Sequence, residues 1–319
     1  MLKISIFYTV TIETEVKMNL VIKDTKINHD VCGLFHFVNT MAASIWVNRN
    51  TDNKLFYDIV GNSPYYDKTL EETDNVWEYY FEQPCQIKYS EIEGPTRYGN
   101  WSSFNGGHNF VTQYHLLPKL IKDKKEELQT VSNVIFNGKN RIILRQDMKD
   151  KIEEVKNRLG LKNNKYISVH YRSFIFDLNK IHNPHQSNKV EYVNWFNEID
   201  KVLTDEHKIF LATDDDEVLE NFKKKYGDRL VYNNNVDRTC DGSVGDNPFK
   251  LPNHLLWHYK SLTLSVNRKQ SPYEMGVQAL IDSYLLSGGD VIIRPNSGLS
   301  FFSVLLNPNI EVINIDKIY

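Results

Sequence analysis

Short apolar runs alternate with helical periodicity along the second half of the chain. The runs are rich in β-branched and aromatic residues, which is typical of buried strands, and between them apolar residues recur every three or four positions. This pattern predicts strands over 166–170, 208–212, 229–231, 290–293 and 310–315, and helices over 189–203, 215–226, 273–287 and 298–305. Strands and helices that take turns predict a parallel sheet with right-handed crossovers, so we expect an α/β, Rossmann-like unit.

The first half is less regular. Its pattern predicts strands over 3–10, 19–22 and 54–60, helices over 33–46, 75–82, 115–129 and 147–159, and an irregular stretch over 94–109. A glycine and a polar linker follow the last helix, and glycine commonly ends helices. We therefore predict a domain boundary there, with one domain over 1–160 and a second over 161–319.

Polar side chains follow three of the predicted strands in the second half. They are His170 and Arg172 after the first strand, Asp214, Asp215 and Asp216 after the second, and Asn296, Ser297, Gly298 and Ser300 after the fourth. The carboxyl ends of parallel strands meet at one edge of the sheet, where ligands of α/β proteins bind. We therefore expect one pocket to receive all three groups.

Each group suits one part of a sugar nucleotide. Arg172 offers a planar fork of donors for a diphosphate. Ser297, Ser300 and the free N–H groups of a helix that starts at Gly298 form a second anion site. A carboxylate of Asp214 or Asp215 can accept hydrogen bonds from a purine or a ribose. A purely structural interpretation also exists for the acids, with Thr213 as the cap of the following helix.

Composition and charge exclude several classes of protein. The 319 residues are 41% hydrophobic and 25% charged, and the formal net charge of −3 argues against a basic nucleic-acid-binding face. Three cysteines without paired spacing indicate neither a disulfide framework nor a zinc site. No apolar run reaches the ~18 residues that span a bilayer, and no strand is followed by a dinucleotide or Walker glycine motif. We expect a cytoplasmic protein without a transmembrane segment, a metal or a bound cofactor.

Three segments in order along the chain resemble the motifs of the GDP-fucose fucosyltransferase superfamily, which includes α1,6-, α1,2- and protein O-fucosyltransferases. They are Val169-His170-Tyr171-Arg172, then Leu211-Ala212-Thr213-Asp214-Asp215, and finally 279–290 with Asn296-Ser297-Gly298-Leu299-Ser300. The resemblance covers about 160–305 and implies a GT-B fold, two Rossmann-like domains facing across a cleft. The donor nucleotide sugar would bind the second domain and a glycan acceptor the first.

The same resemblance implies roles for single residues. Arg172 matches the arginine on the donor diphosphate, His170 its partner near ribose and phosphate, Asp214 or Asp215 the acid near guanine, and Ser297 with Ser300 the third motif. Many members carry a second arginine directly after the first, and this chain has Ser173 there.

The resemblance further implies an inverting reaction without a metal, in which an acceptor hydroxyl attacks the anomeric carbon as GDP leaves. The loop after Arg172 supplies Asp177, His182 and His185, and we expect Asp177 to be the base. Acceptor contacts are expected from 33–39, which includes His36, and from the aromatic segments 65–80 and 101–108, where clustered Tyr and Trp suit sugar rings. There, Trp101 is expected to bind acceptor. For the aromatic cluster of 65–81, a core layer under a helix is the competing interpretation.

Two other classes of function stay open at the level of sequence. Asp214, Asp215 and Asp216 could form a divalent-metal site of the Asp-x-Asp type in a metal-dependent glycosyltransferase of another fold. Alternatively, the chain could bind a nucleotide or glycan without catalysing a reaction. Sensitivity to EDTA, or GDP binding without turnover of any GDP-sugar, would distinguish these alternatives.

Overall fold

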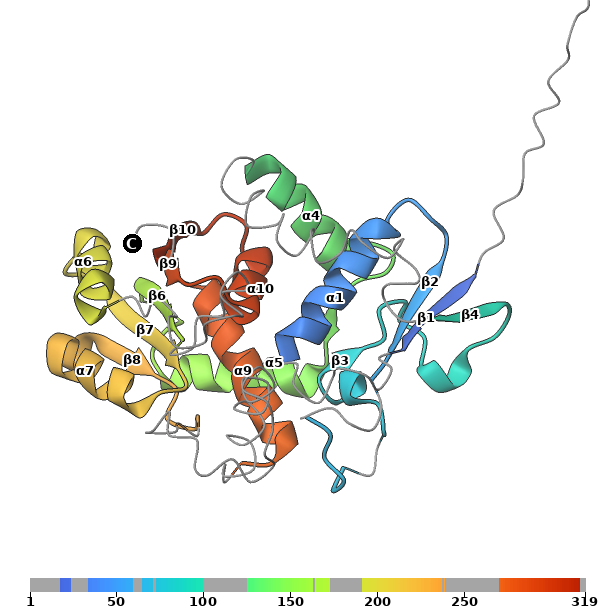
Figure 1. The fold of residues 1–319 in the computed structure, drawn as a ribbon, viewed down its shortest axis with the longest axis horizontal. Helices are drawn as coiled ribbons and strands as arrows, with labels where there is room; N and C mark the ends of the chain where they lie inside the picture. Colours follow the sequence, from blue (N-terminus) through green and yellow to red (C-terminus); the bar gives the residue numbers. More distant parts are fainter. Residues whose placement is uncertain are drawn as a thin grey trace, which may run out of the picture.

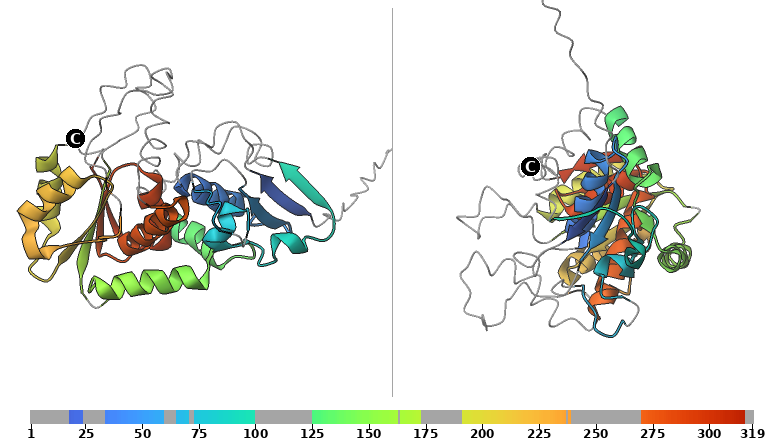
Figure 2. Two further views of the ribbon diagram at one scale, coloured as in Figure 1. Left: turned by 90° about the horizontal axis from the view of Figure 1, so that it is seen from below. Right: turned by 90° about the vertical axis from the view of Figure 1, so that its right-hand side faces the viewer.

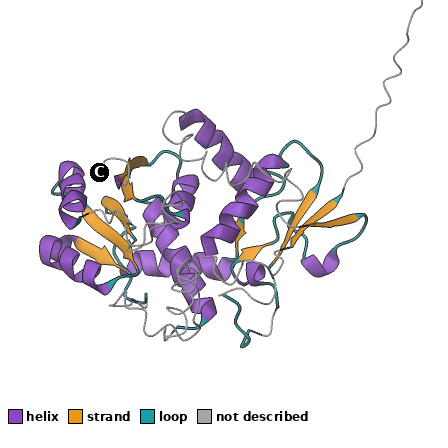
Figure 3. Ribbon diagram, viewed as in Figure 1, coloured by secondary structure: helices purple, strands orange, loops and turns teal. Residues whose placement is uncertain are grey.

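The computed structural model describes residues 18–23, 34–59, 65–70, 73–99, 125–162, 164–172, 191–236, 238 and 270–315. Among these residues, the strands form two separate groups, and a set of helices lies between the groups (Figure 3). No helix of the described residues is long and apolar enough to cross a membrane.

A three-stranded parallel sheet forms from the first half of the chain (Figure 1). Its order is β2-β1-β4, with β1 at Asn19–Lys23, β2 at Lys54–Asp58 and β4 at Thr96–Gly99. The helix α1 (Leu34–Val47) connects β1 to β2 and buries most of its apolar positions, as its periodicity predicts. Two short strands, β3 (Phe81–Glu82) and β5 (Ile143–Leu144), pair separately and antiparallel.

The second half forms a five-stranded sheet in which every pair of neighbours is parallel. Its order is β10-β9-β6-β7-β8. The strands are β6 (Tyr166–Tyr171), β7 (Lys208–Thr213), β8 (Leu230–Tyr232), β9 (Val291–Arg294) and β10 (Glu311–Asn314). The prediction of a parallel α/β sheet is confirmed.

Helices cover both faces of this sheet, and the alternation of side chains along each strand separates two cores. One face packs α6 (Tyr192–Val202) and α7 (Asp216–Tyr226) against Ile167, Val169, Leu211 and Ile293. The other face carries Tyr166, Phe210, Ala212 and Ile292 and packs against α9 (Pro272–Ser287) and α10 (Gly298–Leu306).

One hydrophobic cluster joins the two sheets. It contains residues of α1, α9 and α10 together with α4 (Lys125–Asn137) and α5 (Gln146–Arg158). The helices α1 and α10 lie side by side in the middle of the molecule (Figure 1), and α5 runs along one side of it beside α9 (Figure 2). The predicted boundary near 160 falls between α5 and β6, while the core continues across it, so the division into domains stays a prediction.

Three predictions for the first half were wrong in detail. The expected helix over 75–82 is a single 3₁₀ turn, Val76–Tyr79, whose Asn75 side chain accepts from the Trp77 N–H. The expected irregular stretch contains β4, because its backbone completes the edge of the sheet beside β1. The helix expected over 115–129 has its described part at Lys125–Asn137 and continues beyond the predicted end.

The second part of the aromatic cluster, from Trp77 to Phe81, is core and not a sugar-binding platform, whereas Tyr65 and Tyr66 are half-buried. Trp77, Tyr79, Tyr80 and Phe81 are all at most 3% exposed, and the Trp77 and Phe81 rings stack with centroids 4.4 Å apart. Burying a large aromatic side chain stabilises a fold by a few kcal/mol. These rings therefore contribute to the stability of the core and expose almost no surface to a ligand. For Trp77, Tyr79 and Tyr80, the predicted acceptor contact is wrong, and for all four residues the interpretation as core is confirmed.

Candidate functional site

The candidate site lies where the order of strands reverses. From β6 the chain continues outward to β7 and β8, and the crossover through α9 then returns it to β9 on the other side of β6. Open α/β sheets bind ligands at such a switch point, beyond the carboxyl ends of the strands. The ends of β9, β6 and β7 are direct neighbours, so the three polar groups expected to meet do lie along one edge.

Polar residues at these strand ends share one face of the sheet. Register pairs Val169 with Ile293 and His170 with Ala212, so Arg294 lies next to His170 one position further along. Both belong to the face that packs against α9 and α10, because side chains two positions apart point to the same side. The first half of the chain contributes α1 to the same core.

His170 is buried and uncharged at this edge. Burial, reinforced by the charges of Arg172 and Arg294, lowers the pKa of its imidazole to about 3. Its Nδ1 is buried without a hydrogen-bond partner in the described part of the chain. Arg172, two residues on, is exposed. The sequence predicts that His170 and Arg172 lie together at the end of β6, and the structure adds that the imidazole is neutral and the guanidinium exposed.

The acids after β7 have different structural roles. Asp215 is the N-cap of α7, and its Oδ1 accepts from the Val218 N–H at 3.1 Å. Asp214 precedes this cap, and its Oδ1 is buried without a partner among the described residues. The expected cap, Thr213, instead accepts from the Asp215 N–H at 3.3 Å. Asp214 is thus the acid with an oxygen left to accept from a ligand, while Asp215 stabilises the helix.

A second group of polar residues continues the site toward β8. Arg238 donates through Nε to the Thr213 carbonyl at 3.1 Å and through Nη2 to the Asn233 carbonyl at 2.8 Å. Asp282 of α9 is 7% exposed, and burial raises the pKa of its carboxyl to about 7 against the opposing charge of Arg238. Its Oδ1 has no hydrogen-bond partner in the described ranges. Asp282 can therefore accept a hydrogen bond from a ligand when ionised.

The third motif opens α10. Ser297 is the N-cap residue of this helix, and its side chain makes no capping hydrogen bond. Ser300 is fully buried, and its hydroxyl accepts from Arg294 Nε at 3.0 Å. The first turn of a helix presents free N–H groups and a positive dipole end, so this turn can hold an anion. Ser300 of that turn lies in the core, and Ser297 lies at its start with a slightly larger exposed fraction.

Helix α1 also reaches this turn. Asn39, 3% exposed, donates through Nδ2 to the Gly298 carbonyl at 3.1 Å, and its Oδ1 is buried without a partner among the described residues. His36, one turn earlier, is exposed. The segment 33–39 therefore contacts the first turn of α10 through Asn39, and the acceptor contact expected from this segment stays a prediction.

Several predicted residues lie outside the described part of the chain: Asp177, His182, His185, Trp101 and His108. Among the described residues, no group of three or more His, Cys, Asp and Glu could hold a metal ion. Cys85 is a free cysteine.

Comparison with solved structures identifies the fold. The fucosyltransferase NodZ from Bradyrhizobium is similar over 95% of this chain and 96% of its own, at 17% sequence identity and a TM-score of 0.50. The chain has a GT-B fold. Crystals of the NodZ α-1,6-fucosyltransferase with GDP match at 17% identity, 91% and 93% coverage and a TM-score of 0.48. A mutant of Arabidopsis thaliana FUT1 in complex with GDP matches at 12% identity, 93% and 70% coverage and a TM-score of 0.42.

No protein-family model matches the chain, and no curated protein matches it by sequence. The GT-B fold and the parallel sheet are therefore established by structure alone. The resemblance read from the three sequence motifs agrees with the fold that the NodZ structure shows.

The prediction from sequence assigned no individual role to three residues of the site, although Asp282 lies within the motif 279–290 and Arg294 lies shortly before the third polar group. Arg294 ends an apolar strand, and Asp282 directly follows the apolar run 279–281, so each is a charge in a buried segment. That signal could have found both. Arg238 follows a polar loop, where a charge is ordinary, and only its contacts to the ends of β7 and β8 distinguish it.

Proposed function

We propose that this chain is an inverting, metal-independent glycosyltransferase that transfers fucose from GDP-fucose to a hydroxyl of a glycan acceptor. One observation carries the proposal: cations and unpartnered acceptors meet on one face at the switch point. Arg172, Arg294 and the first turn of α10 suit a diphosphate, and Asp214 with Asp282 suits a nucleoside. The GT-B fold shared with NodZ supports the same class of reaction.

Donor binding then divides between the two sides of β6. The diphosphate lies near Arg172 and the start of α10, since an arginine fork and free N–H groups both complement phosphate oxygens. The nucleoside lies toward β7 and β8, where the carboxylates of Asp214 and Asp282 accept from N–H or hydroxyl groups. His170, neutral between these two regions, contributes a hydrogen bond to ribose or phosphate.

In the reaction, the oxygen of the acceptor hydroxyl forms a bond to the anomeric carbon of fucose. The bond from that carbon to the β-phosphate oxygen breaks, and its electron pair leaves with GDP. The cations at β6 and β9 stabilise the charge that develops on the diphosphate. A single hydrogen-bond donor in such a position typically lowers the activation free energy by ~3–4 kcal/mol. We assign the acceptor's proton to Asp177, which follows Arg172 in the chain.

A panel of nucleotides tests the donor. Thermal unfolding is measured with GDP, UDP and ADP and with their sugars, because a ligand at 100 times its dissociation constant adds ~2.7 kcal/mol to the stability of the folded state. We expect GDP and GDP-fucose to raise the melting temperature most. Equal effects of all three nucleotides, or none of GDP, would contradict the proposal.

Turnover of GDP-fucose with a set of glycan acceptors tests the reaction. Activity is expected to be unchanged in excess EDTA, because Asp215 caps α7 and the fixed charges of Arg172 and Arg294 serve the diphosphate. Loss of activity in EDTA with rescue by Mn²⁺ would favour the metal-dependent alternative. GDP binding without turnover of any GDP-sugar would favour a binding protein.

A further inference from the structure

Arg294 is a fully buried arginine at the carboxyl end of β9. Only 1% of the residue is exposed. Burying a charge is costly unless hydrogen bonds or other charges compensate it, so a buried guanidinium at the edge of a sheet has a structural or functional reason to be there.

Its hydrogen bonds lead to the first turn of α10. Nε donates to the Ser300 hydroxyl at 3.0 Å, and Nη2 donates to the Ser297 carbonyl at 3.3 Å. The Ser300 hydroxyl lies 3.3 Å from the same carbonyl. The guanidinium therefore ties the strand β9 to the turn that begins α10, and a rigid fork with two separate partners sets the position of that turn.

Two further buried polar residues lie nearby, Asn39 beside this turn and His170 beside Arg294. Asn39 donates to the Gly298 carbonyl. The positive charge of Arg294 helps to lower the pKa of His170 on the neighbouring strand. Asn39 Oδ1 and His170 Nδ1 both lack a partner among the described residues, although Asn39 is 3% and His170 4% exposed. Unpartnered polar atoms at this depth indicate that a polar ligand completes the arrangement.

We propose that Arg294 is a positioning residue for the donor diphosphate, which fixes the first turn of α10 and adds a second positive charge to that of Arg172. The inference rests on the proposed function, because it assigns a role toward GDP. Arg172 is exposed and meets the ligand directly, whereas Arg294 acts from the core through Ser300 and the Ser297 carbonyl. Its charge acts in a surrounding of low dielectric, where it is screened less than at the surface.

The experiment compares Arg294→Gln with Arg294→Lys, because glutamine keeps a donor without the charge and lysine keeps the charge without the fork. Isothermal titration with GDP and with guanosine measures the ratio of the two affinities in each variant. We expect Arg294→Gln to lower GDP affinity on the order of 10- to 100-fold and to leave guanosine affinity nearly unchanged. Arg294→Lys is expected to lower the ratio of GDP to guanosine affinity less than Arg294→Gln does.

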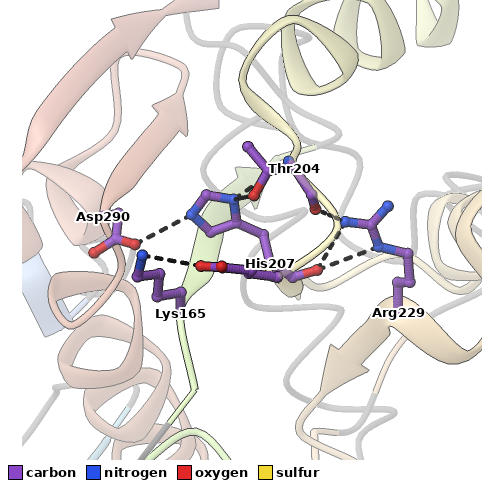
Figure 4. Close-up of polar contacts among 6 residues, drawn as sticks. Lys165, Thr204, His207, Arg229 and Asp290 are labelled. Atoms are coloured by element: carbon purple, nitrogen blue, oxygen red, sulfur yellow. Dashed lines mark hydrogen bonds and ion pairs between the residues drawn. The ribbon is translucent and has the colours of Figure 1, made fainter.

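A matched control exists at the opposite edge of the same sheet. Arg229 also donates to backbone carbonyls, those of Thr204 and His207, and His207 in turn contacts Asp290 before β9 (Figure 4). Arg229→Gln removes the same charge from the molecule at the amino ends of the strands. The ratio of GDP to guanosine affinity is expected to be that of the unchanged protein.

The outcomes separate this inference from the proposed function. An unchanged protein that does not bind GDP contradicts the proposed function itself. If the unchanged protein binds GDP and Arg294→Gln has the same ratio of GDP to guanosine affinity as the unchanged protein, only the role of Arg294 is overturned. Should the glutamine variant fail to fold, Arg294→Lys decides, because it keeps the charge and loses the fork: a lowered ratio of GDP to guanosine affinity supports the positioning role, and a ratio equal to that of the unchanged protein overturns it.

Discussion

At the scale of single residues, Arg172 is the cation that we propose to contact the donor directly. It is exposed beside the buried His170, at the end of the strand next to β9. Replacing Arg172 with alanine should weaken GDP on the order of 10- to 100-fold and guanosine little, because guanosine lacks the charge that the guanidinium meets. Titration calorimetry with both ligands measures this, and Arg172→Lys shows what charge alone retains. Equal losses of affinity for GDP and guanosine would contradict the placement of the diphosphate near Arg172.

Asp282 is the residue from which a dependence on pH is expected. Its pKa of about 7 means that the carboxyl loses its proton near neutrality, with Arg238, Asp214 and Asn233 as the neighbouring groups. If the carboxylate accepts from N–H groups of guanine, GDP affinity rises as the pH increases through about 7. The variant Asp282→Asn should bind GDP more weakly above that pH and without this rise. A rise that survives in the variant would show that another group titrates.

The same carboxyl affects the stability of the ligand-free protein with the opposite dependence on pH: GDP affinity is expected to rise with pH, whereas the stability that Asp282 contributes falls. Its pKa is raised from 3.8 to about 7 on folding, so the folded state holds a proton that the unfolded chain has already lost between those values. Stability from Asp282 is therefore fully present below pH 3.8 and declines as the pH rises toward 7. His170 changes in the other direction, since its pKa falls from 6.5 to about 3. Comparing urea unfolding of Asp282→Asn and the unchanged protein across pH isolates the Asp282 contribution.

At the scale of elements, two neighbouring acids at the start of α7 have different roles: Asp215 caps the helix, and Asp214 is the acid that we propose to bind the nucleoside. Asp215 Oδ1 accepts from the Val218 N–H, so Asp215→Ala should cost about 1 kcal/mol of stability, the usual value for losing an N-cap. Asp215→Ser keeps a capping oxygen and should lose much less. GDP affinity is expected to stay unchanged in both variants and to fall in Asp214→Ala. A loss of GDP affinity in Asp215→Ser at unchanged stability would show that Asp215 itself takes part in GDP binding.

At the scale of the whole molecule, the contact between Tyr80 and α9 joins the two halves. The rings of Tyr80 and Tyr273 stack with centroids 5.7 Å apart, and the Tyr80 hydroxyl donates to the Tyr273 carbonyl at 3.1 Å. A Cβ added at Gly276 would lie 2.1 Å from the Tyr80 hydroxyl oxygen. Glycine is therefore required in the middle of this helix by the close approach of a buried ring, and not by its backbone conformation.

Gly276→Ala should destabilise the protein by about 1–3 kcal/mol through overpacking, although alanine ordinarily favours a helix over glycine by up to ~1 kcal/mol. Because one core continues through both sheets, we expect the fluorescence of Trp77 and that of Trp195 to report the same shifted urea transition. In a Tyr80→Ala background the added methyl group should no longer cost stability, which a double-mutant cycle measures. Separate transitions for the two tryptophans would show that the halves unfold independently.

What the sequence by itself determined is local. The run Tyr166 to Val169 has the side chains of a buried strand, α5 and α9 show helical periodicity, and each of these elements forms within one or two residues of its predicted bounds. The polar ends of β6, β7 and β9 were visible for the same reason, because a strand and the loop that follows it are adjacent in the chain. Residue types within one short window carry this information.

What only the tertiary structure decided is which distant segments meet. The order β10-β9-β6-β7-β8 makes the ends of β9, β6 and β7 neighbours, and no local pattern specifies that order. Tertiary packing placed the aromatic residues from Trp77 to Phe81 in the core, with Tyr79 and Tyr80 against Tyr273 of α9, although Tyr and Trp also suit a sugar-binding surface. The same packing buried Arg294 beside His170 and Asp282 beside Arg238. Burial and the proximity of charges depend on residues far apart in sequence, and these determine the pKa values and the unpartnered atoms that define the candidate site.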